Sequence, residues 1–152
     1  MISIGSKAPD FNLKDHNGKE LKLSDFLGKN VLLSFHPLAW TGVCAQQMQS
    51  LEEHVNDFEK MGVVALGLSV DTVPSKHAWA KELGIEKTPL LSDFWPHGHF
   101  ASLLGIFRKN DGFSERANII VDKKGIIRFI KIYPISELPD IKEMVGELGK
   151  WM

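Results

Sequence analysis

One stretch of the chain gathers the residue types that thiol chemistry needs. It runs from Phe35 to Cys44, F-H-P-L-A-W-T-G-V-C, and contains the only cysteine of the sequence. Cys44 follows an apolar run and opens a segment with helical periodicity. The first backbone N–H groups of a helix have no intrahelical partner and carry about half a positive charge. A thiolate placed there is stabilised and its pKa falls, so the sequence predicts a nucleophilic thiol.

Two further residues of this stretch have the chemistry to shape a site around the thiol. Thr41 lies three residues before Cys44, one turn away on the same side, so its hydroxyl can reach the sulfur or a bound oxygen. Pro37 has no N–H group and can form one wall of a small pocket. Each feature also has an ordinary structural interpretation, with Thr41 as a helix cap and Cys44 as an inert buried thiol.

Hydrophobic periodicity predicts the elements that must position these residues. The Asn17-Gly18 pair predicts a hairpin near the N-terminus, because it accepts the positive φ angles of a two-residue turn. Continuous apolar runs predict buried strands, and apolar residues spaced by three and four predict amphipathic helices. The strands are expected at 31–35, 63–70, 90–92, 118–121 and 126–132, and the helices at 44–61, 74–83, 100–104 and 139–151.

The order of these elements predicts the fold class. Strand–helix–strand units require parallel pairing, whereas the late hairpin around 122–125 requires antiparallel pairing. We therefore expect an α/β protein with a thioredoxin-like fold, in which a mixed central sheet has helices on both faces and an N-terminal β-hairpin. The chain has 152 residues, so we expect a single domain over 1–152 with a core of its own.

Composition and charge exclude several classes of protein. There are 18 Lys and Arg against 19 Asp and Glu, which gives a net charge of −1 and argues against nucleic acid as a partner. No apolar run is long enough to span a membrane, and the start of the chain does not resemble a secretory signal. One cysteine excludes a disulfide scaffold, and together these features predict a cytoplasmic protein.

The sequence predicts neither a cofactor nor a metal. No glycine-rich phosphate loop of useful spacing is present. Six histidines include the pair His97 and His99, but no further His, Cys or carboxylate has metal-ligand spacing around them. We therefore expect this pair to belong to a polar loop.

Four segments resemble one family over essentially the whole chain. Residues 40–44, W-T-G-V-C, resemble the active-site segment of thioredoxin with its first cysteine replaced by threonine. The spacing Pro37-x-x-x-Thr41-x-x-Cys44 matches the signature of the peroxiredoxins. Residues 90–98 resemble a segment of one-cysteine peroxiredoxins of the alkyl hydroperoxide reductase E type. Residues 113–128 resemble the arginine-bearing strand of the family, and residues 4–11 resemble its start.

This resemblance implies a role for each residue that matches the family pattern. Cys44 is expected to be the peroxidatic nucleophile, and Thr41 to orient the peroxide through its hydroxyl. Pro37 is expected to shield the pocket from water. Arg116 is expected to lie over the thiolate and the peroxide oxygens.

Two positions near the thiol depart from the family pattern, and a third contributes through its backbone. Gln47 stands where many relatives carry glutamate, and its expected role is to hold Arg116. His36 stands where many relatives carry an aromatic residue, so this wall of the pocket is expected to be more polar. The N–H groups of Val43 and Cys44 are expected to donate to the leaving oxygen.

The resemblance implies a thiol-dependent peroxidase that reduces hydrogen peroxide or organic hydroperoxides. The product on Cys44 is a sulfenic acid, and no second cysteine is present to resolve it. An external thiol, or a thioredoxin- or glutaredoxin-like protein, is therefore expected as reductant. Phe94 and Trp95 resemble a dimer contact of the family, which implies a homodimer.

Two other functions stay open at this point. A thiol–disulfide oxidoreductase would fit the likeness to thioredoxin, although exchange within one chain needs two sulfurs. A non-enzymatic binding module of the same fold would carry Cys44 as an inert thiol, which would resist thiol reagents.

Overall fold

A seven-stranded mixed sheet forms the centre of the computed structural model, which describes residues 1–151. The strand order is β2-β1-β5-β4-β3-β8-β9. Strands β3, β4 and β5 are parallel to one another, and the pairs β1–β2, β1–β5, β3–β8 and β8–β9 are antiparallel. The bounds are β1 Asn12–Asp15, β2 Glu20–Lys22, β3 Asn30–Phe35, β4 Val63–Ser69, β5 Leu90–Ser92, β8 Arg116–Val121 and β9 Ile127–Tyr133.

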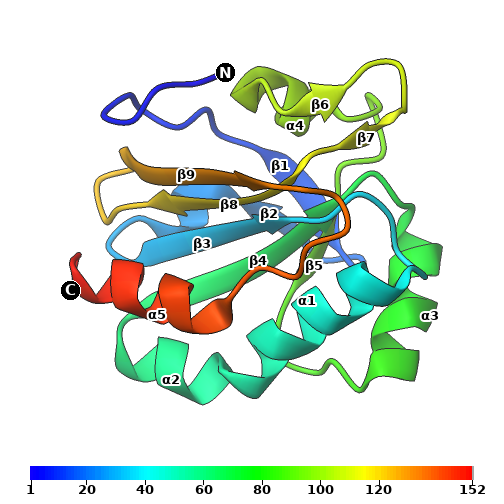
Figure 1. Cartoon of the computed structure of the whole chain (residues 1–152), viewed down its shortest axis with the longest axis horizontal. Helices are drawn as coiled ribbons and strands as arrows, with labels where there is room; N and C mark the ends of the chain where they lie inside the picture. Colours follow the sequence, from blue (N-terminus) through cyan, green and yellow to red (C-terminus); the bar gives the residue numbers. More distant parts are fainter. Residues whose placement is uncertain (152) are drawn as a thin grey trace.

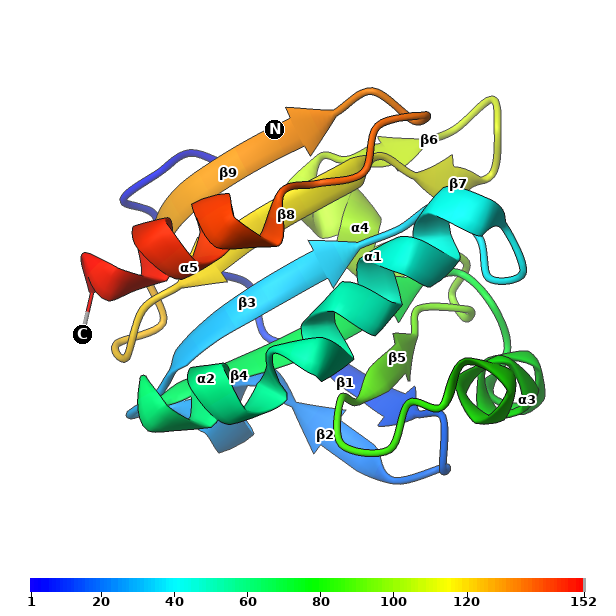
Figure 2. The same ribbon diagram turned by 60° about the horizontal axis from the view of Figure 1, so that its bottom comes forward.

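Helices cover both faces of this sheet (Figure 1). One face carries four helices, which lie in front of the sheet in Figure 2. They are α1 Gly42–Glu53, α2 Val55–Lys60, α3 Val73–Leu83 and α5 Ile141–Gly149. The other face carries α4 His99–Leu104 and the short 3₁₀ helix η1 Leu23–Phe26. The predicted α/β class, with a mixed sheet, helices on both faces and an N-terminal hairpin, is confirmed.

The two faces build two hydrophobic cores from alternating residues of the same strands. On β3, Leu32 packs into the core under α1, whereas Leu33 and Phe35 pack into the core under α4. On β8, Ile120 and Ile119 divide in the same way. A strand that is covered on both faces is apolar at most positions, which is why these strands appear in the sequence as nearly continuous apolar runs.

The predicted helix at 44–61 is present as two helices that meet at His54. The ring nitrogen Nδ1 of His54 donates to the carbonyl of Ser50, 2.9 Å away. In an uninterrupted helix this carbonyl would accept from the backbone N–H of His54. That N–H donates instead to the carbonyl of Leu51, at 3.2 Å, so α1 ends here and α2 begins.

Two smaller features also differ from the sequence prediction. The first hairpin has a three-residue turn, because Asp15 pairs with Lys19 around His16, Asn17 and Gly18. A second, very short hairpin joins β6, Phe107–Arg108, to β7, Phe113–Ser114. Strands of two residues leave no alternating pattern in a sequence, so periodicity could not predict them.

The sheet brings distant parts of the chain to one edge. Parallel strands β3 and β4 end together, with Phe35 opposite Leu68. Because β8 is antiparallel to β3, it begins at the edge where β3 ends, and Ala117 lies opposite Phe35. Arg116, the first residue of β8, therefore lies beside the start of α1. None of the helices formed by residues 1–151 is long and apolar enough to cross a membrane.

Candidate active site

Cys44 lies in the first turn of α1 and is buried, with 1% of its surface exposed. The helix begins after Thr41, whose carbonyl accepts from the N–H of Ala45 at 2.9 Å. The N–H groups of Val43 and Cys44 come before this bond and so belong to the set that lacks intrahelical acceptors. The predicted position of the thiol, at the positive end of a helix dipole, is confirmed.

Arg116 contacts the thiol directly. Its Nη1 lies 3.3 Å from Cys44 Sγ and donates to Gln47 Oε1 at 2.7 Å. Its Nε donates to the carbonyl of Ile135 at 2.9 Å. Two neutral acceptors, one on α1 and one in the segment after β9, thus hold the guanidinium beside the sulfur.

Gln47 holds this guanidinium and is itself held by the strand behind it. While Oε1 accepts from Arg116, Nε2 donates to Ser34 Oγ at 2.8 Å and to the carbonyl of Phe35 at 3.1 Å. Among residues 1–151, no carboxylate forms an ion pair with Arg116. The positive charge of Arg116 therefore acts on the thiol without a competing anion in direct contact.

The loop that joins β3 to α1 leads directly to the thiol. Pro37, which was predicted to form one wall of the site, is buried. Thr41 is exposed, and its hydroxyl donates to the carbonyl of Leu38 at 2.9 Å, not to Cys44. Its oxygen keeps a lone pair, and its proton becomes available only when the hydroxyl turns away from Leu38.

Trp40 fixes the tip of the same loop. It has a left-handed backbone, with φ of 66°, which is uncommon for a residue other than glycine. Its indole Nε1 donates to Ser75 Oγ on α3 at 3.1 Å. The tip is thus tied to a neighbouring helix, although 55% of the Trp40 surface is exposed.

A polar cluster next to this loop, buried except for the half-buried Asp71, did not emerge from the sequence analysis. It consists of His36, Ser69, Asp71 and Lys76, and it contacts the loop through His36 and Ala39. Burial, helped by the charges of Lys76 and Arg116, holds the pKa of His36 well below its ordinary value. His36 is therefore neutral near neutral pH.

Two signals in the sequence could have revealed this cluster. Lys76 shares a helical face with Trp79 and Ala80, and a lysine among buried residues of an amphipathic helix is unusual. Asp71 follows the strand that runs parallel to β3, so its side chain had to arrive at the same edge of the sheet as Pro37.

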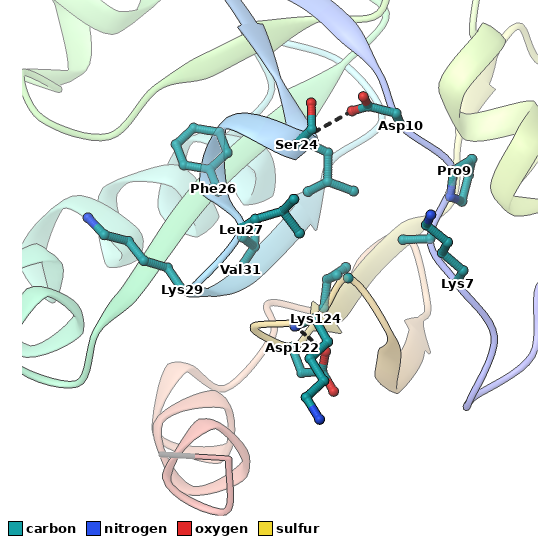
Figure 3. Close-up of a pocket in the computed structure, with 14 residues that line it drawn as sticks. Lys7, Pro9, Asp10, Ser24, Phe26, Leu27, Lys29, Val31, Asp122 and Lys124 are labelled. Carbon is teal, nitrogen blue, oxygen red and sulfur yellow. Dashed lines mark hydrogen bonds between the residues drawn. The ribbon is translucent and has the colours of Figure 1, made fainter.

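A cavity of about 530 Å³ lies away from the thiol (Figure 3). It is bordered by η1, by Val31 at the start of β3 and by Val121 at the end of β8. Cys44 follows the opposite end of β3, and the lining residues, all within 7–125, include none of the predicted site residues. The candidate active site is therefore the group formed by Cys44, Arg116 and Gln47, and not this cavity.

The two histidines of the pair His97 and His99 lie in different surroundings, because His97 belongs to the expected loop whereas His99 is the first residue of α4. His97 Nε2 donates to the carbonyl of Gly112 at 2.7 Å. Within the described part of the chain, no three His, Cys, Asp or Glu side chains come together as a metal-binding group.

Comparison with known proteins places this geometry in context. Residues 4–130 match the model of the AhpC/TSA family. The chain is 41% identical over 141 residues to alkyl hydroperoxide reductase E of Mycobacterium tuberculosis, and the match covers 92% of each protein. It is 38% identical over 145 residues to peroxiredoxin-2 of Mus musculus, which covers 90% of this chain and 71% of that protein.

Solved structures agree with this result. The crystal structure of AhpC from Enterococcus faecalis superposes with a TM-score of 0.90 at 26% identity, covering 99% of this chain and 92% of that one. The reduced 2-Cys peroxiredoxin of Plasmodium vivax superposes with a TM-score of 0.87 at 28% identity, covering 97% and 81%. The predicted thioredoxin-like fold is therefore confirmed.

Proposed function

The chain belongs to the AhpC/TSA family and is a thiol-dependent peroxidase, and from this premise we propose that Cys44 is its peroxidatic nucleophile. The observation that carries the proposal is the contact of 3.3 Å between Arg116 Nη1 and Cys44 Sγ at the start of a helix. A guanidinium and a helix N-terminus both favour the thiolate, which is the reactive form. The single cysteine of the chain fits a one-cysteine mechanism.

The proposed reaction is a displacement at oxygen. The Cys44 thiolate attacks one peroxide oxygen, an S–O bond forms, and the O–O bond breaks. Sulfur is oxidised to a sulfenic acid, and the leaving oxygen departs with the electron pair. That oxygen takes a proton from solvent and leaves as water or an alcohol.

Ionisation of the thiol alone cannot account for a dedicated peroxidase. A free thiol with a pKa of about 8.5 is roughly 3% thiolate at pH 7, so complete ionisation gains only about 30-fold, near 2 kcal/mol. Donors aimed at the leaving oxygen are each worth about 3–4 kcal/mol when judged by removal. Arg116 and the N–H groups of Val43 and Cys44 are the proposed donors, because all lie at the sulfur end of α1.

The loop supplies the remaining proposed roles. Thr41 orients the peroxide once its hydroxyl turns from the carbonyl of Leu38 toward the substrate. Pro37, which is buried and has no N–H to bind water, shields the sulfur. Gln47 keeps Arg116 in place through its amide oxygen.

Regeneration needs electrons from outside the chain, because no second cysteine exists within it. One external thiol condenses with the sulfenic acid to give a mixed disulfide and water. A second external thiol then attacks this mixed disulfide. Cys44 is released as a thiol, and the two external thiols leave joined in a disulfide. A small thiol, or a thioredoxin- or glutaredoxin-like protein, fills this role, and the reducing cytoplasm suits it.

A homodimer is proposed for the assembled enzyme. Trp95 exposes 80% of its surface and the adjacent Phe94 exposes 44%. Two neighbouring exposed aromatic residues are typical of an interaction surface, since large aromatic side chains are enriched at the centres of interfaces. The same two residues also resemble a dimer contact of the family.

Stopped-flow tryptophan fluorescence of the reduced protein tests the proposal, because Trp40 lies four residues from the thiol. We expect a fast phase that is first order in hydrogen peroxide or an organic hydroperoxide and absent from Cys44→Ser. A rate no faster than that of free cysteine would refute the assignment. If an equimolar disulfide oxidised Cys44 faster than an equimolar peroxide, the protein would instead act as a thiol–disulfide oxidoreductase.

A further inference from the structure

Lys76 is a fully buried lysine, with 0% of its surface exposed, and the proposed reaction does not use it. It lies on α3 beside Trp79 and Ala80, which pack into the core beneath α1. Its Nζ donates to Ser69 Oγ at 2.5 Å and lies 3.4 Å from His36 Nε2. Burying an ammonium group is costly, so its surroundings indicate what it contributes.

The first path from Lys76 runs through Ser69 to the active-site loop. The Ser69 hydroxyl donates to Asp71 Oδ2 at 2.6 Å, and the same oxygen accepts from the backbone N–H of Ala39 at 2.8 Å. A carboxylate only accepts, so the single Ser69 proton is committed to Asp71, and the Ser69 oxygen must accept from Lys76. The hydrogen bonds thus converge on the Asp71 carboxylate, from Lys76 through Ser69 on one side and from the loop at Ala39 on the other.

The second path runs through His36, the residue just before Pro37. The backbone N–H of His36 donates to the carbonyl of Leu68 at 3.0 Å, and its ring packs 5.3 Å from that of Trp79. Nε2 of the ring lies 3.4 Å from Lys76 Nζ, so Lys76 contacts His36 directly.

We propose that Lys76 is a positioning residue of the peroxidase, which holds the loop of residues 36–41 over Cys44 at two points. It binds His36 directly, and it holds the N–H of Ala39 through Ser69 and Asp71. These two points lie on either side of Pro37, so Lys76 sets the place of the wall that shields the sulfur. The inference rests on the proposed role of Cys44 as nucleophile.

The charge of Lys76 gives this device a pH dependence. Burial lowers the pKa of Lys76 to about 7, against the opposing attraction of Asp71, Cys44 and Asp93. The ammonium group makes stronger hydrogen bonds than the neutral amine, so the loop is expected to be held less firmly as pH rises through this value. The titratable groups that face Lys76 come from several elements: His36 after β3, Cys44 on α1, Asp71 after β4, Asp93 after β5 and His16 in the first hairpin turn.

A double-mutant cycle tests the proposal. Lys76→Met removes both paths, Ser69→Ala cuts the path to Ala39, and Lys81→Met on the exposed face of α3 is the matched control. The second-order rate with hydrogen peroxide is measured at a pH where thiolate absorbance shows Cys44 to be fully ionised. We expect each of the first two variants to react with peroxide roughly tenfold more slowly than wild type. The double variant is expected to be slower than wild type by the same factor of about ten, and not by a factor of about a hundred.

The pH dependence of the second-order rate with peroxide supplies a second readout, which a purely structural role of Lys76 would leave unchanged. Wild type and Lys81→Met are expected to show an inflection near pH 7, and Lys76→Met to lack it. If circular dichroism shows Lys76→Met to be unfolded, Ser69→Ala and Asp71→Ala carry the test, with the same tenfold loss alone and no further loss when combined.

Three results would overturn the inference: a Lys76→Met rate within threefold of wild type, multiplicative losses in the cycle, or an inflection that persists without Lys76. Failure of the inference and of the proposed function are distinguishable. If wild type itself does not react with peroxide, the function fails. If wild type reacts and all variants match Lys81→Met, only the role of Lys76 is lost.

Discussion

The guanidinium of Arg116 makes three contacts, and each meets a different requirement. Gln47 and the carbonyl of Ile135 fix its position, and its positive charge acts on the sulfur of Cys44. Because Gln47 and the carbonyl of Ile135 are both neutral, they do not neutralise the positive charge of the guanidinium. A group that is held before the reaction starts needs no reorganisation when charge develops on the leaving oxygen.

Arg116→Ala is therefore expected to slow the reaction with peroxide by about 10²–10³-fold. This loss should exceed the fall in the thiolate fraction of Cys44, because the arginine also acts on the leaving oxygen. Stopped-flow rates and ultraviolet thiolate absorbance on the same sample separate the two effects. Arg128→Ala is the matched control, since Arg128 pairs with Asp122 on the β8–β9 hairpin, away from the thiol.

A rate loss in Arg116→Ala that the thiolate fraction fully explains would contradict this account. In that case the arginine would serve only to ionise the thiol.

At the scale of elements, α1 carries the nucleophile and is held at its other end by a carboxylate. Glu52 accepts hydrogen bonds from the backbone N–H groups of Glu86, Lys87 and Thr88, between 2.9 and 3.2 Å. Partial burial raises the pKa of Glu52, but these N–H donors outweigh that effect and lower it below its ordinary value. The clip joins the C-terminal end of α1 to the loop that leads into β5.

Glu52→Gln is expected to lower the free energy of unfolding at pH 7 by about 1–2 kcal/mol, because an amide replaces one accepting oxygen with a donor. The folded-state pKa is the lower one, so the contribution is present above the unfolded pKa, near 4.5, and is lost as pH falls through the folded value. Urea unfolding of wild type and variant at several pH values measures both trends.

The exposed neighbour Glu53 supplies the control for this clip, and Glu53→Gln should change stability by less than about 0.5 kcal/mol. A difference between wild type and Glu52→Gln that persisted undiminished below pH 4 would show that the carboxylate charge is not what holds the loop.

At the scale of the whole molecule, the thiol site and the exposed aromatic surface of Phe94 and Trp95 are carried by neighbouring parts of the fold. Asp93 follows β5 and accepts from Phe100 and Ala101 in α4, which fixes the segment that presents Phe94 and Trp95. Burial raises the pKa of Asp93, against the opposing effect of these two N–H donors. The proposed dimer surface is thus anchored to the same sheet that carries the thiol site.

Trp95→Ser is expected to convert a dimer to a monomer in sedimentation velocity, because truncating an exposed aromatic anchor removes the largest apolar contribution to such an interface. Leu27→Ser tests specificity, since Leu27 is also a large exposed apolar residue, with 63% exposure, but lies beside the cavity of Figure 3. A wild type that sediments as a monomer, or a dimer that survives Trp95→Ser, would refute the proposed surface.

Local pattern was sufficient to predict much of this protein. The buried strands, the helix that carries Cys44 and the mixed sheet all follow from periodicities that involve residues close together in the chain. The site residues came from motif spacing and family resemblance, and the structure brings Cys44, Arg116 and Gln47 into contact. The Thr41 hydroxyl was expected near the sulfur, but it donates to Leu38.

Tertiary structure alone decided the polar connections. Cys44 and Arg116 are 72 residues apart, and Lys76 meets His36 across 40 residues. Such pairs depend on which strands end at the same edge and in which register, and no local pattern encodes either. The break at His54 depends on one ring nitrogen taking a backbone acceptor, a choice between two hydrogen bonds of similar strength. Short-range order is thus written in the sequence, whereas the partners of buried polar groups are set by the packing of the whole sheet.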